Sequence, residues 1–290
     1  MSSTNTNPNA NQNPNPINYI LVDTSYWIFY RYYAIYRWWT HAKSEDPLPE
    51  NPADNPEFVE KFKKTFIESI ELFKKKQKIH KTPCKIIAAR DCPRHEIWRN
   101  SIYPQYKETR GKDDAFMGGE FFKCVYANNN EMLYKTGVNH VLKFPTLEAD
   151  DIVAISKNWI RQKYPDAQIY ILANDHDYLQ LLDDKCEIIN FQMKNLRESK
   201  KVLATGEQNL FYKIILGDKS DNIKSVFKKC GPKTTEKYYN DPTELEKALN
   251  SEEGARINYE RNKKLVSFAE IPQELTDSFI ELNRDILASL

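Results

Sequence analysis

The sequence predicts an α/β protein with a mostly parallel central sheet, helices on both faces of that sheet, and a helical C-terminal region. Three observations support this fold class. Short apolar segments alternate with amphipathic segments over residues 18–191. Acidic residues directly follow several of the apolar segments, and residues 207–290 show only helix-like patterns. Strands that alternate with helices favour parallel pairing through crossover connections.

The composition supports a folded intracellular protein. The chain has 290 residues, of which 40% are hydrophobic and 29% charged, so it can bury a sizeable core. Lys and Arg number 42 against 41 Asp and Glu, which excludes a uniformly basic surface. The five cysteines include no C-x-x-C pair, which argues against a zinc ribbon or a disulfide scaffold and favours a reducing compartment.

The first 39 residues contain two unusual segments. Residues 1–16 form an Asn- and Pro-rich tail that we expect to be disordered, and they lack the pattern of a signal peptide. Residues 17–39 are apolar and aromatic, but Asp23, Arg31 and Arg37 lie among them. Charges at bilayer depth are costly, so we expect a buried strand followed by an aromatic helix and no membrane partner.

The predicted elements follow in order along the chain. A strand at 18–22 ends at Asp23, and a helix follows at about 25–38. After a proline-rich loop, five apolar residues recur at helical spacing and predict an amphipathic helix: Phe58, Phe62, Phe66, Ile70 and Phe73. A second strand is predicted at 85–89, and charged and aromatic residues dominate the stretch that follows it, 94–136.

The second half of the predicted sheet has the same alternation. A third strand is predicted at 138–144, and Thr146 is a suitable N-cap for a helix at about 147–163. A fourth strand at 168–173 ends just before Asp175, and a fifth is predicted at 186–191.

Acidic residues lie at or just past the carboxyl ends of these strands. The first group is Asp23, Asp91 and Asp175; Glu148, Asp150 and Asp151 open the helix after the third strand; Asp177, Asp218 and Asp221 are candidates to join them. The carboxyl ends of parallel strands converge on one crevice, where nine negative charges would repel one another. Hard oxygen ligands in this number favour two Mg²⁺ or Mn²⁺ ions, about 3.5–4 Å apart, and phosphodiester hydrolysis. The alternative for each acid taken alone is a turn former or a helix cap.

Six short segments, in order, carry a family resemblance. They are residues 21–26 (LVDTSY) with the helix that follows, 103–110 (YPQYKETR), 147–152 (LEADDI), 173–177 (ANDHD), 216–223 (LGDKSDNI) and 231–234 (GPKT). Together they resemble the 5′–3′ exonuclease and flap endonuclease family, as in the 5′-nuclease domain of bacterial DNA polymerase I and phage 5′ nucleases, with a PIN-like core. The resemblance covers about residues 17–245. Low glycine and abundant Asn, Lys and Ile also suggest an AT-rich source genome, such as that of a large DNA virus.

The resemblance implies a division of the chain and roles for the site residues. Residues 17–206 would be the catalytic core, with an arch at about 92–136, and 207–290 a DNA-binding region with a helix–hairpin–helix element. By resemblance the first metal would be held by Asp23, Asp91, Glu148 and Asp150. The second would be held or oriented by Asp151, Asp175, Asp177, Asp218 and Asp221. Lys107 and Arg110 would face the scissile phosphate, and K⁺ is an optional ligand at the hairpin.

Two segments are candidates for nucleic-acid contact. Residues 94–117 interleave basic residues (Arg94, Arg99, Lys107, Arg110 and Lys112) with Trp98, Tyr103, Tyr106 and Phe116. That mixture suits a single strand that stacks on aromatic rings, and the alternative is a surface hairpin packed by its own aromatics. Lysines of the C-terminal region, namely Lys224, Lys228, Lys229 and Lys233, are candidates for contact with a duplex.

Asn174 stands where the family has glycine. Asn tolerates a left-handed backbone better than most residues, so we expect the turn to be kept there.

The predicted function is a structure-specific 5′ nuclease that hydrolyses DNA with a 5′ flap or 5′ end in replication or repair. One alternative is a ribonuclease H-type 5′ nuclease that removes RNA primers from RNA–DNA hybrids. The other is a non-catalytic nucleic-acid-binding paralogue, which the presence of every motif acid disfavours. We further expect an intracellular monomer without a clamp-binding peptide.

Overall fold

A computed structural model of the chain describes residues 17–110, 116–200 and 202–290. The predicted disordered tail and Lys112 lie outside the described residues.

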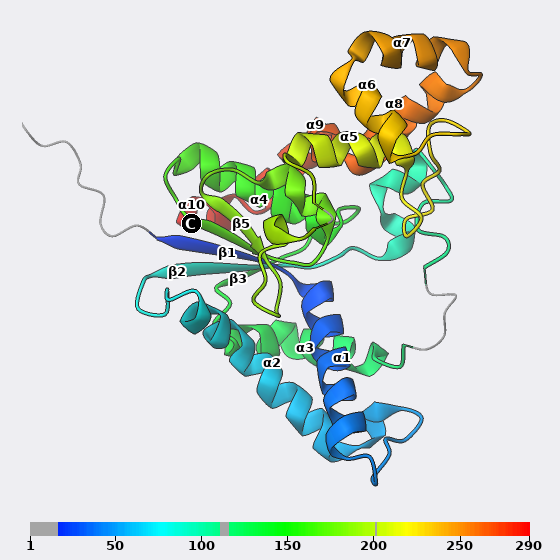
Figure 1. Cartoon of the computed structure of the whole chain (residues 1–290). Coiled ribbons are helices and arrows are strands. Elements are labelled where there is room, and N and C mark those ends of the chain that lie inside the picture. Colours follow the sequence, from blue (N-terminus) through cyan, green and yellow to red (C-terminus); the bar gives the residue numbers. More distant parts are fainter. Residues whose placement is uncertain (1–16, 111–115, 201) are drawn as a thin grey trace, which may run out of the picture.

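The core is a sheet of five strands, all of them parallel. The strands are β1 (Asn18–Asp23), β2 (Cys84–Ala89), β3 (His140–Leu142), β4 (Ile169–Leu172) and β5 (Cys186–Ile189). Their order across the sheet is β3-β2-β1-β4-β5, which places β1 at the centre (Figure 1). The predicted fold class is confirmed, although the edge strand β3 is shorter than the predicted 138–144.

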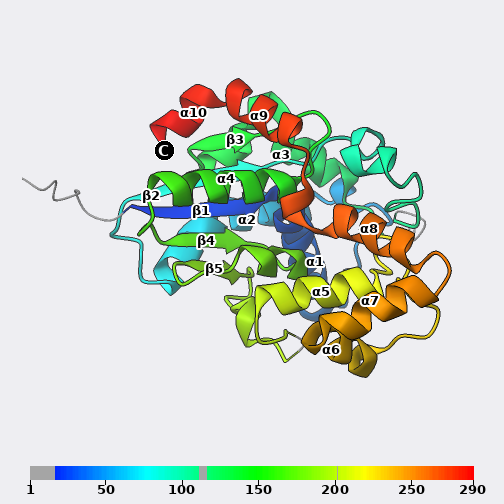
Figure 2. The ribbon, with the colours of Figure 1, turned by 90° about the horizontal axis from the view of Figure 1, so that it is seen from above.

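Helices cover both faces of the sheet. Successive side chains of β1 point to opposite faces, and those on each face are buried under helices. Ile20 and Val22 pack with α1 (Thr24–Ala42), α2 (Pro56–Lys76) and α3 (Gly119–Lys135). Tyr19 and Leu21 pack on the other face with α4 (Ala149–Lys163), α9 (Gln273–Leu282) and α10 (Arg284–Ser289). Figure 2 shows α4, α9 and α10 lying over the strands.

The first of these helices, α1, is longer than predicted and runs from Thr24 to Ala42. Its inner face is fixed by aromatic packing, since the Trp27 ring stacks on Phe66 of α2 with centroids 4.2 Å apart. The predicted phenylalanine stripe of α2 is confirmed, because all of its members are buried.

The start of α4 differs from the prediction. The N-cap is Glu148, whose side chain and that of Asp151 form a reciprocal capping box, and the helix begins at Ala149. Thr146, the predicted cap, instead has a left-handed backbone with φ 73°, and its carbonyl accepts the Trp98 amide at 3.0 Å. The tertiary contact with residue 98 therefore decides the turn, and the acidic motif itself caps the helix.

The C-terminal region is helical, as predicted. Four helices form a lobe beside the sheet: α5 (Gly206–Leu216), α6 (Pro232–Asn240), α7 (Pro242–Ser251) and α8 (Ala255–Val266) (Figures 1 and 2). Their small core includes Ile215, Phe227 and Leu249. The last two helices, α9 and α10, leave this lobe and return to the sheet beside α4, which the sequence pattern did not indicate.

The predicted arch segment, about 92–136, combines 3₁₀ helices and turns with the α-helix α3. The described residues between 92 and 118 contain no α-helix, only the 3₁₀ helices η2 (Arg94–Glu96) and η3 (Trp98–Ser101) and turns. Ile97, Tyr103 and Tyr106 pack against Ile214 and Leu265 of the lobe. The helix α3, the other part of the predicted arch, packs under the sheet with α1 and α2. Within the described parts of the chain, no helix is long and apolar enough to cross a bilayer.

Candidate metal site at the carboxyl ends of the strands

The strand ends bring together acids from distant parts of the sequence. Asp23 is the last residue of β1, and Asp91 and Asp175 follow β2 and β4, the two neighbours of β1. The carboxylates of Glu148, Asp150 and Asp151, at the start of α4, offer oxygens that lie within 4.8 Å of one another. These are the positions at which open parallel sheets place their binding crevices.

Three further acids border this crevice. Asp177 lies in the 3₁₀ helix η4 (His176–Leu181) after β4, whereas Asp218 and Asp221 lie in the turn after α5. Asp177 and Asp218 are linked through Lys213, and Asp221 contacts the 106–110 segment, so the lobe is joined to the acids of the sheet.

Arg99 holds the inner pair of acids. Its Nη1 and Nη2 bind both oxygens of Asp151 at 2.8 and 2.7 Å, and Nη1 also binds Glu148 at 2.9 Å. Trp98 Nε1 donates to Asp151 at 3.0 Å, and Arg99 Nε donates to the Leu265 carbonyl of α8 at 2.7 Å. Arg99 is only 1% exposed, and although burial alone would lower the pKa of its guanidinium, Asp151 and its neighbours raise that pKa.

Lys107 and Arg110 also reach into the acids. The Lys107 ammonium contacts Glu148 and lies 3.9 Å from Asp221, and Arg110 pairs with the other oxygen of Asp221. Lys107 has a left-handed backbone with φ 55°, held by a 3.0 Å hydrogen bond from its amide to the Asp221 carbonyl. Tyr106 Oη lies between Glu148 and Asp221, at 3.1 and 3.4 Å.

These cations control the charge of Glu148. Burial alone would raise the pKa of the Glu148 carboxyl, but Lys107 and Arg99 outweigh burial, so that pKa is lowered. The acid therefore stays ionised although it is only 4% exposed.

Lys213 of α5 is a site residue that the sequence analysis missed. Its ammonium contacts Asp177 and lies 2.7 Å from Asp218. Burial alone would raise the pKa of Asp218. The Lys213 ammonium and hydrogen bonds from Ser220 outweigh burial and lower that pKa to about 2. A lysine four residues before the GDKSD segment was the only available signal, and nothing local indicates the direction of its side chain.

Four of the nine acids have no cationic partner within the described residues: Asp23, Asp91, Asp150 and Asp175. Neutral donors hold them instead. Asp23 accepts the Tyr26 amide at 2.9 Å and Tyr178 Oη at 3.1 Å, while Asp91 accepts the Ala149 amide at 2.8 Å and Ser25 Oγ. The sequence analysis had not singled out Ser25 or Tyr178.

Burial and neighbouring acids both disfavour the charged form of the unpaired acids. Burial and then the neighbouring Asp91 raise the pKa of Asp23 to about 7. Burial, Glu148 and Asp151 likewise raise the pKa of Asp150 well above its usual range. An all-oxygen set of clustered carboxylates with too few cations fits hard divalent ions such as Mg²⁺ or Mn²⁺, so the residues present suit the predicted metals.

The aromatic residues of the predicted single-strand platform are mostly buried. Trp98, Tyr103 and Tyr106 are each at most 7% exposed, which favours the alternative of a segment packed by its own aromatics. Arg99 and Tyr106 were predicted to contact nucleic acid, but both are buried and bound to carboxylates. In this structure their side chains therefore position acids and offer no surface to a strand.

The remaining predicted contacts lie on the surface. Arg94 is exposed and donates to the Arg110 carbonyl. The four candidate lysines of the lobe are exposed and make no ion pair with the described residues: Lys224, Lys228, Lys229 and Lys233. The backbone amide of Lys228 donates to the Glu252 carboxylate at 2.8 Å.

Asn174 does not have the expected left-handed backbone, because its φ angle is not positive. Its side-chain oxygen accepts a hydrogen bond from Asn190 Nδ2 at 3.0 Å, so the side chain ties the end of β4 to the segment after β5.

A parallel sheet with carboxylates at the ends of its central strands is typical of metal-dependent phosphoryl-transfer enzymes. The comparison with known families narrows this class. The 5′-3′ exonuclease N-terminal resolvase-like domain matches residues 18–210, and the chain belongs to that family. The family resemblance predicted from the sequence is thereby confirmed, and four of the six segments that carried it lie within the matched residues.

The chain is similar to parts of two known proteins. The chain is 29% identical over 196 residues to a 5′-3′ exonuclease of Mycoplasmopsis pulmonis, which covers 65% of this chain and 62% of the relative. It is 31% identical over 128 residues to DNA polymerase I of Caldicellulosiruptor bescii, covering 40% of this chain and 14% of the relative. The chain thus spans less than two thirds of these relatives.

Solved structures show the same fold over nearly the whole chain. The flap endonuclease D15 of bacteriophage T5, in a complex with DNA and metal ions, superposes with a TM-score of 0.62 at 18% identity, covering 93% of this chain and 99% of that one. T5 5′-exonuclease with bound zinc gives the same TM-score at 19% identity.

Proposed function

We propose that the chain is a metal-dependent, structure-specific 5′ nuclease that hydrolyses phosphodiester bonds of DNA at a 5′ flap or 5′ end. The observation that carries the proposal is the clustering of acids at the carboxyl edge of the sheet, where Lys107 contacts Glu148 and Arg110 contacts Asp221. Membership of the 5′-3′ exonuclease family and the exonuclease activity named for the Mycoplasmopsis relative support it.

The acids divide into two proposed metal sites. We assign Asp23, Asp91, Glu148 and Asp150 to the first, and Asp151, Asp175, Asp177, Asp218 and Asp221 to the second, where some act through water. When bound, two Mg²⁺ or Mn²⁺ ions would activate a water molecule and stabilise the charge that develops on the phosphate. Tyr178 and Ser25 position Asp23 and Asp91 for this task. Because Arg99, Trp98 and the Glu148 amide already occupy the Asp151 oxygens, Asp151 acts indirectly, by orienting Glu148 of the neighbouring first site.

Lys107 and Arg110 are the proposed phosphate-facing cations. Lys107 is buried between Glu148 and Asp221, and Arg110 lies at the rim with its side chain 41% exposed. A phosphate that enters the crevice can take over these cations from the carboxylates, because Lys supplies a point charge and Arg a planar fork of donors. The buried position of Lys107 also keeps water from competing for its ammonium.

Cleavage assays on matched substrates test the proposal. We expect Mg²⁺-dependent cleavage of a 5′-flap DNA, a low rate on blunt duplex, and no cleavage in EDTA. An RNA–DNA hybrid of the same sequence in the same assay tests the ribonuclease H-type alternative. Binding of flap DNA without cleavage in Mg²⁺ or Mn²⁺ would contradict the proposal and favour a non-catalytic paralogue.

The lobe lysines are the proposed duplex anchor. Replacing Lys228, Lys229 and Lys233 together by Ala should weaken duplex binding and flatten the logarithmic salt slope by roughly two to three units. The control is Lys237→Ala, because Lys237 already pairs with Glu244 at 2.7 Å. Fluorescence anisotropy between 50 and 200 mM salt gives the slope, and comparison of K⁺ with Na⁺ tests the optional K⁺ site. An unchanged slope in the triple variant would place the anchor elsewhere.

A further inference from the structure

The outer face of α1 is aromatic although the core does not require it. Trp27, Tyr32 and Trp39 fill the interior from the inner face of this helix. On the outer face, Phe29 and Tyr33 remain 39% and 40% exposed. Apolar side chains that are exposed together on one face are typical of an interaction surface.

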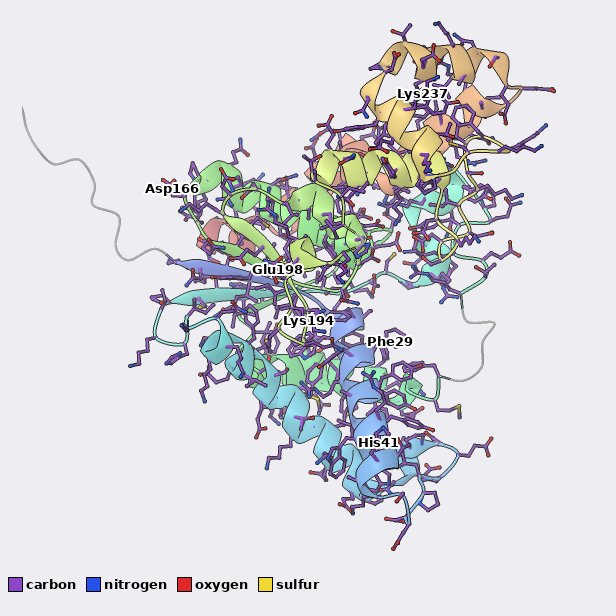
Figure 3. The ribbon with its side chains drawn as sticks, in the orientation of Figure 1. Phe29, His41, Asp166, Lys194, Glu198 and Lys237 are labelled. Carbon is purple, nitrogen blue, oxygen red and sulfur yellow. The ribbon has the colours of Figure 1, made fainter. Side chains whose placement is uncertain are left out.

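These rings line one wall of a groove of about 420 Å³, here called the α1 groove. The wall on the helix has the spacing of one helical face and consists of Tyr26, Tyr30, Tyr33 and Arg37, with Phe29 at its edge. The other wall consists of the amide side chains Asn174, Asn190 and Gln192. Figure 3 labels Phe29 on α1 and Lys194 on the segment after β5, the segment that supplies Asn190 and Gln192.

The rings of the α1 groove are held in place. Tyr30 stacks on Phe191 with centroids 5.6 Å apart, and Tyr26 Oη accepts the Phe191 amide at 3.0 Å. Phe116 contacts the rings of Phe29 and Tyr33 at 4.4 and 5.8 Å. A flat ligand that binds here therefore loses little side-chain freedom of the protein, which favours affinity.

The polar groups of the α1 groove suit nucleotides. Among the described residues that line it there is no carboxylate, and Arg37 is the one charged side chain; Arg37 makes no ion pair with any of the chain's described residues. Arg37 Nε donates only to the Tyr33 carbonyl at 3.3 Å, which leaves its terminal nitrogens for an anion. Rings for stacking, amides for base edges and a cation for a phosphate are the groups that bind unpaired nucleic acid.

The α1 groove begins at the acidic crevice. The Tyr26 amide donates to Asp23, and Asn174 directly precedes Asp175. From Tyr26 to Arg37 the helix rises about 16 Å. Figure 1 shows that α1 leads away from the strand ends on the side opposite to the lobe of α5–α8.

We propose that the α1 groove binds unpaired nucleotides adjacent to the scissile phosphate, with bases stacked on Tyr30 and Tyr33 and a phosphate on Arg37. The proposal rests on the proposed nuclease function, and it places the stacking surface on α1 in place of the buried aromatics of residues 94–117.

The test compares two tyrosines of the same helix. Tyr33 and Tyr36 are 40% and 39% exposed, and of the two only Tyr33 lines the α1 groove. The probe is a fluorescein-labelled 5′-flap DNA with an oligodeoxyadenylate arm, measured by anisotropy in EDTA so that no cleavage occurs. Tyr33→Ser should weaken binding at least about five-fold, the lower end of what one stacked base contributes. Tyr36→Ser should bind like the wild type, and so should Tyr33→Phe, which keeps the ring.

Two further arms separate base stacking from phosphate contact. On a flap whose arm carries abasic sites, the wild type should lose its advantage over Tyr33→Ser, because no base remains to stack. Arg37→Gln should lower the logarithmic salt slope by about one unit on both arms. Binding to a blunt duplex should be unchanged in both variants.

Equal losses for Tyr33→Ser and Tyr36→Ser, or a loss that persists on the abasic arm, would overturn the proposal.

A second copy of this chain is the other candidate occupant of the α1 groove. If Tyr33→Ser converts a dimer to a monomer in sedimentation while DNA binding is unchanged, the α1 groove is a contact between copies. If the wild type cleaves flap DNA but Tyr33→Ser binds normally, only this proposal fails. If the wild type neither binds nor cleaves DNA, the proposed function fails with it.

Discussion

Two groups of acids lie at the same edge of the sheet and differ in what balances their charge. The first is paired with cations of the chain and comprises Glu148, Asp151, Asp177, Asp218 and Asp221. The second has no cationic partner within the described residues and comprises Asp23, Asp91, Asp150 and Asp175.

The difference indicates which acids hold parts of the chain together and which acids most need bound metal ions. The cations of the paired group come from outside the sheet, from residues 99–110 and from Lys213 of α5. Their ion pairs therefore attach the 99–110 segment and the lobe to the sheet and hold the acids in place. Three of the four unpaired acids lie on the sheet strands or directly after them, where only neutral donors reach them. We infer that the unpaired group needs bound cations most, and that the first proposed metal site has the higher affinity.

The largest effect should come from the unpaired group. Asp150→Ala should abolish Mg²⁺-dependent cleavage, a loss of about 10³-fold or more, because a ligand of the proposed first metal is lost. DNA binding should stay within a few-fold, since phosphate contacts supply the affinity. Single-turnover cleavage and anisotropy on the same 5′-flap DNA measure both quantities.

The matched control for this change is Asp166→Ala, an exposed aspartate beyond the other end of α4 (Figure 3). It should cleave like the wild type. Near wild-type turnover by Asp150→Ala would show that the unpaired acids do not hold the metals.

The second effect should come from the paired group and appear in stability. Arg99→Met strands the buried carboxylates of Asp151 and Glu148, and breaking a buried pair of this kind costs roughly 3–5 kcal/mol. Urea unfolding in EDTA measures the change. The control is Lys123→Met, which breaks an exposed pair with Glu120 and should shift the midpoint little. A double variant with Asp151→Leu should recover part of the loss. Equal midpoints for both single variants would contradict the assigned role of Arg99.

The sequence predicted the sheet well because each strand is a short apolar run, and a carboxylate ends or closely follows β1, β2 and β4. The five strands, the α2 stripe and the convergence of the acids at the strand ends follow from such local patterns. Local patterns failed where a tertiary contact decides the outcome. The turn at Thr146 depends on Trp98, and the side chain of Asn174 binds Asn190, which is 16 residues away.

The candidate site shows the same limit. Residue type predicted which acids gather, but it could not predict which of them the chain neutralises. Lys213 and Arg99 meet their partners only after α5 and the 98–110 segment pack on the sheet. The aromatic residues of 94–117 and of α1 look alike in the sequence, and their contacts alone separate the buried set from the exposed one.

The smallest effect concerns the pH dependence of stability. In the folded chain the pKa of Asp23 is raised to about 7, whereas an unfolded aspartate has a pKa near 3.9. Between these values the folded protein keeps a proton that the unfolded chain has released. The free energy of unfolding should therefore rise as the pH falls from 7.5 to 5.5 without divalent ions. Asp218, with a pKa of about 2, acts in the opposite direction but below this window.

Asp23→Asn should be more stable than the wild type at pH 7.5 in EDTA and should flatten this dependence by an amount on the order of 1 kcal/mol. Some slope should remain, since burial and Asp175 raise the pKa of Asp177 to about 7 as well. Urea unfolding at pH 5.5 and 7.5 gives the two free energies for each protein. Mg²⁺ at pH 7.5 should stabilise the wild type more than Asp23→Asn, because only the wild type keeps the full set of unpaired carboxylates. Parallel pH profiles with equal Mg²⁺ effects would mean that burial and mutual repulsion of the unpaired acids do not create their demand for cations.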